Sequence, residues 1–303
     1  MTLAPVKPHL QNLLKSAGVY ERAKVSMLYD LYWYLIDRSI IDDRQREIDF
    51  YRDLLQGFRD GELIFDVGAS HGYKVDIVLR LGAHVIAIEP DATNQEILRQ
   101  RFLELRLKKR PLVIVGKAVS DSCSIGRMWI DAPGSAKNTL SRKWAETLRA
   151  DGKRFGDRLS FDRWRTVETV SMERLIDEYG PPFFLKIDVE GHELNVLRGM
   201  QRPVPYVSFE VNLPEFRPEG LACVEVLGRL DAEGTFNYTA DCRRGLALQE
   251  WCPADEFSSL LNSSTDASIE VFWKSATARP SRGAVHAARH AGRLRSRAQS
   301  AAQ

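Results

Sequence analysis

The hydrophobic pattern from residue 62 onward alternates between short apolar runs and longer amphipathic stretches. Short apolar runs bounded by turn residues predict strands, and apolar residues recurring every three or four positions predict helices. A repeated strand-then-helix order indicates a parallel sheet covered by helices on both faces. The expected strands are 62–67, 83–89, 111–120, 183–187, 205–211, 235–240 and 268–274.

Helical spacing is clearest in three places. Residues 1–60 read as helical, with Ile48, Tyr51, Leu54 and Leu55 on one face, and we expect this segment to form a lid or brace on the main domain. In 71–82 a helical pattern ends at Gly82, a typical C-terminal stop.

The stretch 91–105 predicts a third helix, which we expect to open with a capping box from Thr93 to Glu96. The region 125–166 departs from the strand–helix rhythm and is expected to form a hairpin and a mobile loop. We therefore divide the chain into an N-terminal extension (1–60), a main domain (61–274) with an insertion at about 131–165, and a tail (275–303).

Charge is unevenly distributed along the 303 residues. The formal net charge of the chain is +2, yet six arginines and no acid follow Lys274. Without these arginines the formal net charge of residues 1–274 is 2 − 6 = −4. A mildly acidic body disfavours a nucleic-acid enzyme with a basic groove. The tail is poor in large apolar residues and is expected to be disordered. It is either an inert solvated segment or a weak contact to anionic lipids.

Composition favours a globular protein, since 44% of the residues are hydrophobic. The four cysteines show no C-x-x-C pair, and the sequence has no apolar run of about 18 residues such as a membrane helix requires. We expect a soluble, cytoplasmic protein with reduced thiols. The sequence does not predict an oligomeric state.

The first strand ends in a glycine turn that carries an acid. Asp66 precedes Gly68 and Gly72, and this G-x-x-x-G spacing differs from the dinucleotide motif G-x-G-x-x-G. Asp66 would repel a pyrophosphate, whereas a ligand with ammonium and sulfonium groups suits the turn. The alternative is a packing turn in another kind of α/β protein.

The second strand also ends in an acid, Glu89. In a doubly wound sheet an acid at this position accepts hydrogen bonds from the two hydroxyls of a ribose. The alternative is an exposed position near a helix start. Because Asp66 and Glu89 follow consecutive strands, together they suggest S-adenosylmethionine as the cofactor. Ala118, after the third strand, is expected to border the adenine.

The strand 183–187 runs directly into Asp188, Glu190 and His192. Burying a carboxylate costs several kcal/mol unless it is paired or hydrogen-bonded, so such a cluster is typical of a functional cleft. A strand beside the first one would deliver Asp188 into the crevice where open α/β sheets bind ligands.

Several motifs together resemble one family. The stretches IFDVGASHG, IEP, GKAVSD, KNTLS and above all LKIDVEGHELNVLRGM are similar to the FkbM family of S-adenosylmethionine-dependent O-methyltransferases. The likeness covers roughly residues 62–274. It implies a class I methyltransferase fold, Rossmann-like, with a seven-stranded, mostly parallel sheet whose last strand is antiparallel.

The resemblance also implies methyl transfer to hydroxyls of sugars, glycolipids or polyketides. Its KNTLS counterpart lies near the cofactor cleft, so Asn138 is a candidate site residue, a plain turn being the alternative. The chain departs from the family at Ser70, where the family usually has Asn, which leaves the contact of this turn with the cofactor's methionine end open. Ser70 is retained as a candidate cofactor residue.

Methyl transfer to an unactivated alcohol requires alignment and removal of the hydroxyl proton. Glu190 and Glu210 are the first candidates for the base, followed by His192. The alternatives are a surface role for His192 and a structural role for Glu210. Transfer removes the sulfonium charge, so Asp188 near the sulfur would stabilise bound cofactor more than the transition state.

Two further questions concern metals and the acceptor. Asp188, Glu210 and Asn212 offer oxygen ligands where some O-methyltransferases hold magnesium. The resembled family is not generally metal-dependent, so we expect no metal. Residues that select the acceptor are expected in 131–165 and in the N-terminal helices. The insertion carries Trp144, Phe161 and Trp164, which could stack on a sugar or simply pack.

Two other functions compete with the enzyme. The first is a catalytically inactive S-adenosylmethionine- or nucleotide-binding protein that keeps the fold. The second is an NAD(P)-dependent oxidoreductase, which the missing G-x-G-x-x-G motif disfavours.

Overall fold

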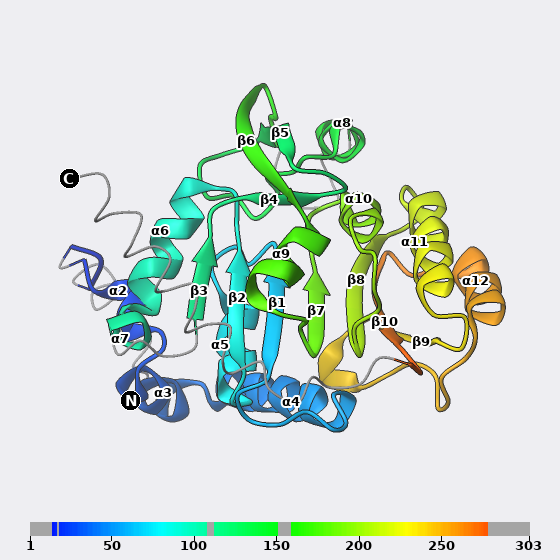
Figure 1. Cartoon of the computed structure of the whole chain (residues 1–303). Coiled ribbons are helices and arrows are strands. Elements are labelled where there is room, and N and C mark those ends of the chain that lie inside the picture. Colours follow the sequence, from blue (N-terminus) through cyan, green and yellow to red (C-terminus); the bar gives the residue numbers. More distant parts are fainter. Residues whose placement is uncertain (1–13, 17, 108–111, 151–158, 278–303) are drawn as a thin grey trace.

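The computed structural model describes residues 14–16, 18–107, 112–150 and 159–277. A twisted seven-stranded sheet forms its centre, in the order β3-β2-β1-β7-β8-β10-β9, and helices lie on both faces (Figure 1). A second sheet, in the order β4-β6-β5, lies at one end of the first. This arrangement is the α/β fold expected from the sequence.

The element bounds follow the chain. The strands are β1 (Leu63–Val67), β2 (His84–Ile88), β3 (Leu112–Val115), β4 (Ala118–Ser120), β5 (Ser124–Ile130), β6 (Arg163–Ser171), β7 (Phe184–Ile187), β8 (Tyr206–Asn212), β9 (Thr235–Thr239) and β10 (Ser268–Lys274). The helices are α2 (Tyr20–Ala23), α3 (Met27–Ile36), α4 (Arg38–Leu54), α5 (Tyr73–Arg80), α6 (Ala92–Arg101), α7 (Leu103–Leu107), α8 (Arg142–Ala150), α9 (Met172–Tyr179), α10 (Glu193–Arg198), α11 (Arg217–Leu230) and α12 (Ala254–Ser263), with a 3-10 turn η1 (Cys242–Arg244).

Strand direction agrees with the class I methyltransferase fold. β1 pairs in parallel with β2 and β7, and β7 pairs in parallel with β8. β10, the last strand in the chain, is antiparallel to both of its neighbours, β8 and β9. The expected seven-stranded sheet with an antiparallel last strand is therefore confirmed.

Two apolar clusters fill the space between the sheet and its helices. One includes Phe65 and Phe209 with residues of α9, α10, α11 and α12. The other includes Ile64 with residues of α4, α5 and α6. Because adjacent strand residues point to opposite faces, Ile64 and Phe65 belong to different clusters. The helical face predicted before residue 60 is found in α4, where Tyr51 is fully buried.

Two of the predicted helix ends can be compared with the structure. The residue Gly82 follows the C-cap of α5 with φ of +91°, which confirms the predicted stop. The predicted capping box from Thr93 to Glu96 is wrong. Asp91 is the N-cap of α6, and its carboxylate accepts hydrogen bonds from the backbone N–H groups of Thr93 and Asn94.

The expected third strand is divided between the two sheets. β3 pairs with β2, whereas β4 leaves the main sheet and pairs in parallel with β6. The break falls at Gly116, where a Cβ would lie 2.7 Å from the Gln95 side chain. A bulkier residue would meet this helix side chain, so the chain turns away at a glycine.

The irregular region before β6 contains a helix that the sequence pattern did not predict. α8 packs Trp144 and Leu148 into the core, and Phe161 is also buried. Of the three aromatic residues singled out above, only Trp164 is exposed, at 47%. Residues 151–158, which include part of the predicted mobile loop, and most of the basic tail (278–303) lie outside the described residues.

Among the described helices, none is long and apolar enough to cross a bilayer. All four cysteines fall within the described residues, and none of them forms a disulfide.

Candidate cofactor and acceptor site

A cleft of about 50 Å³ opens where β1, β2 and β7 end. Eight of the residues predicted from the sequence line it, and they come from five separate parts of the chain. These residues are Gly68, Ser70, Glu89, Ala118, Asn138, Asp188, Glu190 and His192.

Gly68 brings the ends of β1 and β7 together. Its φ is +85°, and a Cβ added there would lie 1.8 Å from the backbone oxygen of Asp188. Its N–H donates to the backbone oxygen of Ile88 at 2.9 Å. Glycine is needed here both for the left-handed backbone and for the close approach of two chain segments.

Backbone groups hold Glu89 at the end of β2. Its carboxylate accepts one hydrogen bond from the N–H of Ser70 and another from the N–H of Asp91, both at 2.8 Å. Ser70 itself has a positive φ of 45°. Burial raises the pKa of Glu89 to about 7, although these backbone hydrogen bonds act in the opposite direction.

Asp66 and Gly72 belong to the same turn but do not line the cleft. Asp66 is 2% exposed and is in register with Lys186 of β7. Neither of its carboxylate oxygens has a hydrogen-bond partner among the described residues, and burial raises its pKa to about 6. Gly72 is the N-cap of α5, where a Cβ would lie 2.6 Å from Leu98, so it serves the packing of α5 on α6.

Asn138 organises the loop that closes one side of the cleft. Its side-chain amide donates to Asp91 at 2.8 Å, and its side-chain oxygen accepts from the N–H of Asp131 at 3.0 Å. Asn138 thus connects the loop to the cap of α6.

Ala118, the first residue of β4, is buried against the same cleft.

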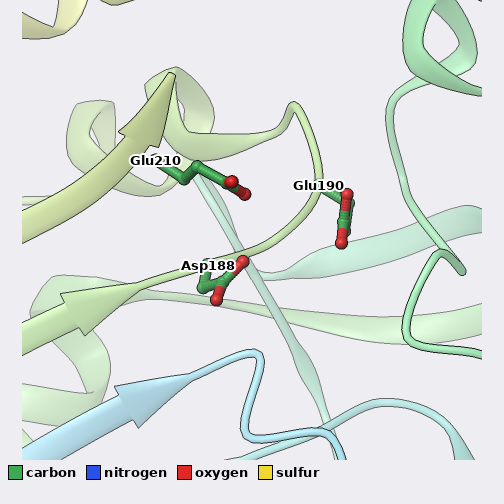
Figure 2. A group of neighbouring side chains, drawn as sticks. All are labelled: Asp188, Glu190 and Glu210. Carbon is green, nitrogen blue, oxygen red and sulfur yellow. The ribbon is translucent and has the colours of Figure 1, made fainter. Parts of the chain in front are cut away.

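Three carboxylates converge beside this cleft. Asp188 follows β7, Glu190 lies on the next loop and Glu210 lies on β8; one oxygen of each falls within 4.8 Å of the others. Figure 2 shows the three side chains reaching toward one space from these different elements. The sequence predicted Asp188 and Glu190 just after one strand and Glu210 within another, and the parallel pairing of β7 with β8 brings them together.

Two lysines offset part of this negative charge. Lys186 donates to Asp188 at 2.8 Å, and Lys137 donates to Glu190 at 2.9 Å. Although burial acts to raise the pKa of Asp188, the ammonium groups of Lys186, Lys74 and Lys137 together hold that pKa below its usual value. Burial, then the charges of Asp188 and Glu190, raise the pKa of Glu210 to about 7.

Neither lysine was a predicted site residue. Lys186 is only 5% exposed, within the strand that the sequence identified as mostly buried. A lysine inside an apolar run is the signal that could have been used, because a buried ammonium requires a carboxylate partner.

The insertion holds Glu190 in place. Its second carboxylate oxygen accepts from the indole N–H of Trp144 at 2.8 Å, and its backbone oxygen accepts from the Thr139 hydroxyl at 2.7 Å. Glu190 has a positive φ of 55°, and a Cβ on the following Gly191 would lie 2.7 Å from the Phe216 ring. Packing from both sides therefore fixes this strained turn.

His192 and Glu193 complete the turn before α10. The imidazole Nε2 of His192 lies 3.1 Å from the Ser120 hydroxyl oxygen, and burial lowers the His192 pKa to about 4. Such a histidine is neutral at neutral pH and is a weak base. Glu193 accepts backbone hydrogen bonds from Val189 and Gly191, both at 3.1 Å, so it closes the turn.

Comparison with known proteins identifies similar sequences. The model of the FkbM methyltransferase domain matches residues 66–234, more than half of the chain. The hexuronic acid methyltransferase AglP of Haloferax volcanii is 26% identical over 173 residues. That match covers 56% of this chain and 63% of the relative, so it spans less than two thirds of the relative's length.

Two of the solved structures that resemble this chain are distant in sequence. The precorrin-6y C5,15-methyltransferase of Geobacter metallireducens has a TM-score of 0.35 at 7% identity, with 76% of this chain and 86% of that chain covered. A sarcosine dimethylglycine methyltransferase from Galdieria sulphuraria, described as putative, has a TM-score of 0.39 at 6% identity, with 78% and 87% covered. At these scores neither similarity bears on the function.

Proposed function

Because the chain belongs to the FkbM methyltransferase domain family, we propose that it transfers a methyl group from S-adenosylmethionine to a hydroxyl of a sugar, glycolipid or polyketide-type acceptor. The main observation in support of this proposal is that two features of the structure adjoin each other. A cleft at the strand ends, bordered by Gly68 and Glu89, meets the carboxylate cluster at Asp188.

The donor groups of the cleft fit this cofactor. Glu89 presents a carboxylate oriented by two backbone N–H groups, as required to bind ribose hydroxyls. The absence of a side chain at Gly68 leaves backbone at the cleft wall, and Ala118 offers an apolar surface for the adenine. Asp188, ionised beside Lys186, would face the positive end of the cofactor.

Asp66 takes an indirect part in this proposal. It does not line the cleft, but it lies in register with Lys186, which in turn pairs with Asp188. We therefore assign it a positioning role through Lys186. Gly72 likewise supports the turn by packing.

We assign the base to Glu210. When bound, S-adenosylmethionine supplies a methyl group on a sulfonium, and it leaves as the neutral thioether S-adenosylhomocysteine. Glu210 accepts the proton of the acceptor hydroxyl as the new carbon–oxygen bond forms. A carboxylate with a pKa of about 7 suits this task, because it is largely ionised just above neutral pH and still basic.

The other candidate bases are less suitable. Both carboxylate oxygens of Glu190 accept hydrogen bonds, from Lys137 and from Trp144. His192 is neutral, but its low pKa makes it a poor proton acceptor. Within the described residues, the one hydrogen bond to the Glu210 carboxylate comes from the Ser268 hydroxyl at 2.7 Å.

The family relationship and the named relative support a glycan acceptor, since that relative is a hexuronic acid methyltransferase. The four unpaired thiols support a reducing compartment, and we propose the cytoplasm.

Titration calorimetry with S-adenosylmethionine tests the cofactor assignment. We expect the wild type to bind, and we expect Glu89→Ala to lose at least tenfold in affinity, roughly the effect of two lost hydrogen bonds. The matched control is Glu96→Ala, because Glu96 is an exposed acid on α6 with 58% of its side chain accessible. Unchanged affinity in Glu89→Ala would refute the assignment. Binding without methyl transfer to any acceptor would instead indicate an inactive binding protein.

A further inference from the structure

A second cavity, of about 340 Å³, lies on the other side of the carboxylate cluster. Asp188 lines both this cavity and the cofactor cleft, so the two spaces meet at that residue. Glu210 lines the second cavity and not the first. A group held in the second cavity would therefore reach Glu210 from the side opposite the cofactor cleft.

Most of the residues that line the second cavity carry hydrogen-bonding side chains. In addition to the two acids above, the polar lining consists of Lys74, Lys186, Thr239, Asp241, Ser268 and Glu270. Thr239 and Ser268 are hydroxyl residues, and Glu270 already accepts from the Ser208 hydroxyl at 2.8 Å. A wall of this kind offers hydrogen-bond partners to a ligand with many hydroxyl groups.

The charges of the lining are unequal. Four carboxylates, those of Asp188, Glu210, Asp241 and Glu270, face the two ammonium groups of Lys74 and Lys186.

Charged residues next to the cavity lining do not remove this excess of carboxylates over ammonium groups. Lys74 is paired with Glu47, and Asp66 lies beside Lys186. These two acids are matched in number by Arg243 and Arg244, which pair with Asp241. Lys137 is already paired with Glu190. The cavity and its surroundings therefore hold two more carboxylates than cations.

We propose that this second cavity is the acceptor subsite and that it selects an uncharged, hydroxyl-rich acceptor, such as a neutral hexose residue, over an acceptor that carries a carboxylate. The inference rests on the proposed function and adds to it the charge of the substrate. It also moves acceptor selection away from residues 131–165, because the cavity is built by β7, β8, β9, β10 and Lys74 of α5.

The test uses two probes that differ in one group: p-nitrophenyl β-glucoside and p-nitrophenyl β-glucuronide, each titrated at pH 8 in the presence of S-adenosylhomocysteine. We expect the glucoside to bind at least about tenfold more tightly, since a ligand carboxylate would meet a net negative wall. A crystal soaked with the glucoside should show it between the ends of β7, β8 and β10.

Removal of one carboxylate from the cavity lining should reduce the preference for the glucoside over the glucuronide. Glu270→Gln keeps the shape of the side chain. We expect it to reduce the ratio of the glucoside affinity to the glucuronide affinity about fivefold, because one unit charge about 4 Å away in a water-like dielectric has an effect of this size. Asp241→Asn should act in the same direction, which gives a second variant if the first fails to fold. Glu225→Gln is the matched control, because Glu225 is an exposed acid on α11, and its ratio should equal that of the wild type.

Three outcomes would overturn the inference: equal or tighter binding of the glucuronide, unchanged ratios in both folded wall variants, or no binding of either glycoside. Calorimetry with S-adenosylmethionine on the same samples separates this inference from the proposed function. If the cofactor binds and the glycosides fail, only the acceptor subsite is refuted. If the cofactor itself fails to bind, the proposed function is refuted.

Discussion

The backbone oxygen of Asp188 occupies the space beside Gly68 that any side chain would need, 1.8 Å from the position of a Cβ. The glycine turn after β1 and the carboxylate cluster are thus in direct contact through their backbones. A change at either residue should affect the other.

Replacement of Gly68 by alanine should therefore be severe. The positive φ alone costs about 1–2 kcal/mol for a residue with a Cβ, and the contact with Asp188 adds a displacement of the chain. We expect loss of S-adenosylmethionine binding in calorimetry and a lower melting temperature. Gly57→Ala is the matched control, since Gly57 has a similar φ of +88° with nothing within 4 Å of its Cβ position. Equal effects of the two substitutions would contradict the steric argument.

The rate of methyl transfer should depend on pH through Glu210. Burial raises the pKa of this carboxyl to about 7, and only the ionised form accepts a proton. Single-turnover rates should therefore fall as the pH drops below about 7 and level off above it. Glu210→Gln should lower the rate by about 10²–10⁴-fold and remove this pH dependence.

Glu190→Gln tests the competing assignment of the base. We expect this variant to keep the pH dependence, because Glu190 is engaged by Lys137 and Trp144. If the pH dependence of the rate instead disappears in Glu190→Gln and persists in Glu210→Gln, then Glu190 is the base and Glu210 is not.

Lys186 should contribute strongly to stability. It is buried between Asp66 and Asp188, and its removal leaves buried carboxylates without a counter-charge. We expect Lys186→Met to lower the free energy of unfolding by about 3 kcal/mol in urea denaturation. Lys117→Met is the control, because Lys117 pairs with Glu168 at an exposed position and should cost less than about 1 kcal/mol.

A second substitution tests the cause of this loss. Asp188→Asn in the Lys186→Met background should restore part of the stability, since one of the uncompensated charges is then removed. Further destabilisation by Asp188→Asn would argue against a charge effect.

Chelators should leave methyl transfer unchanged. Two of the three converging carboxylates already accept ammonium hydrogen bonds, from Lys186 at 2.8 Å and from Lys137 at 2.9 Å. A divalent ion would have to displace these lysines. The measurement is activity in excess EDTA, with and without added Mg²⁺; a loss that Mg²⁺ restores would establish a metal at Asp188, Glu190 and Glu210.

Much of the fold could be predicted because its signals are local. The strand runs, the stop at Gly82 and the acids after β2 and β7 can all be recognised within a few residues. The start of α6 shows the limit of such signals. Asp91 and Thr93 are both good N-cap residues. In the structure the N-cap is Asp91, and its N–H donates a hydrogen bond to the Glu89 carboxylate at the end of the preceding strand.

The candidate site was predictable in its acids but not in their partners. Lys186 pairs in register with Asp66 across two strands that are distant in the sequence. Trp144 reaches Glu190 only because α8 packs against the core. The buried residues Trp144, Ala145 and Leu148 have helical spacing, so the helix could have been predicted, but its contact with Glu190 could not. Contacts of this kind depend on tertiary packing, which overrides local propensity.

The indole of Trp144 joins the insertion at 131–165 to the carboxylate cluster, and this limits how the protein can be re-engineered. A segment transplanted from a homologue into positions 131–165 would bring new surface features, but without a donor at position 144 it would leave a Glu190 oxygen without this partner. Chimeras should therefore retain that tryptophan. The insertion is not an interchangeable module, because its residue Trp144 holds one carboxylate of the cluster.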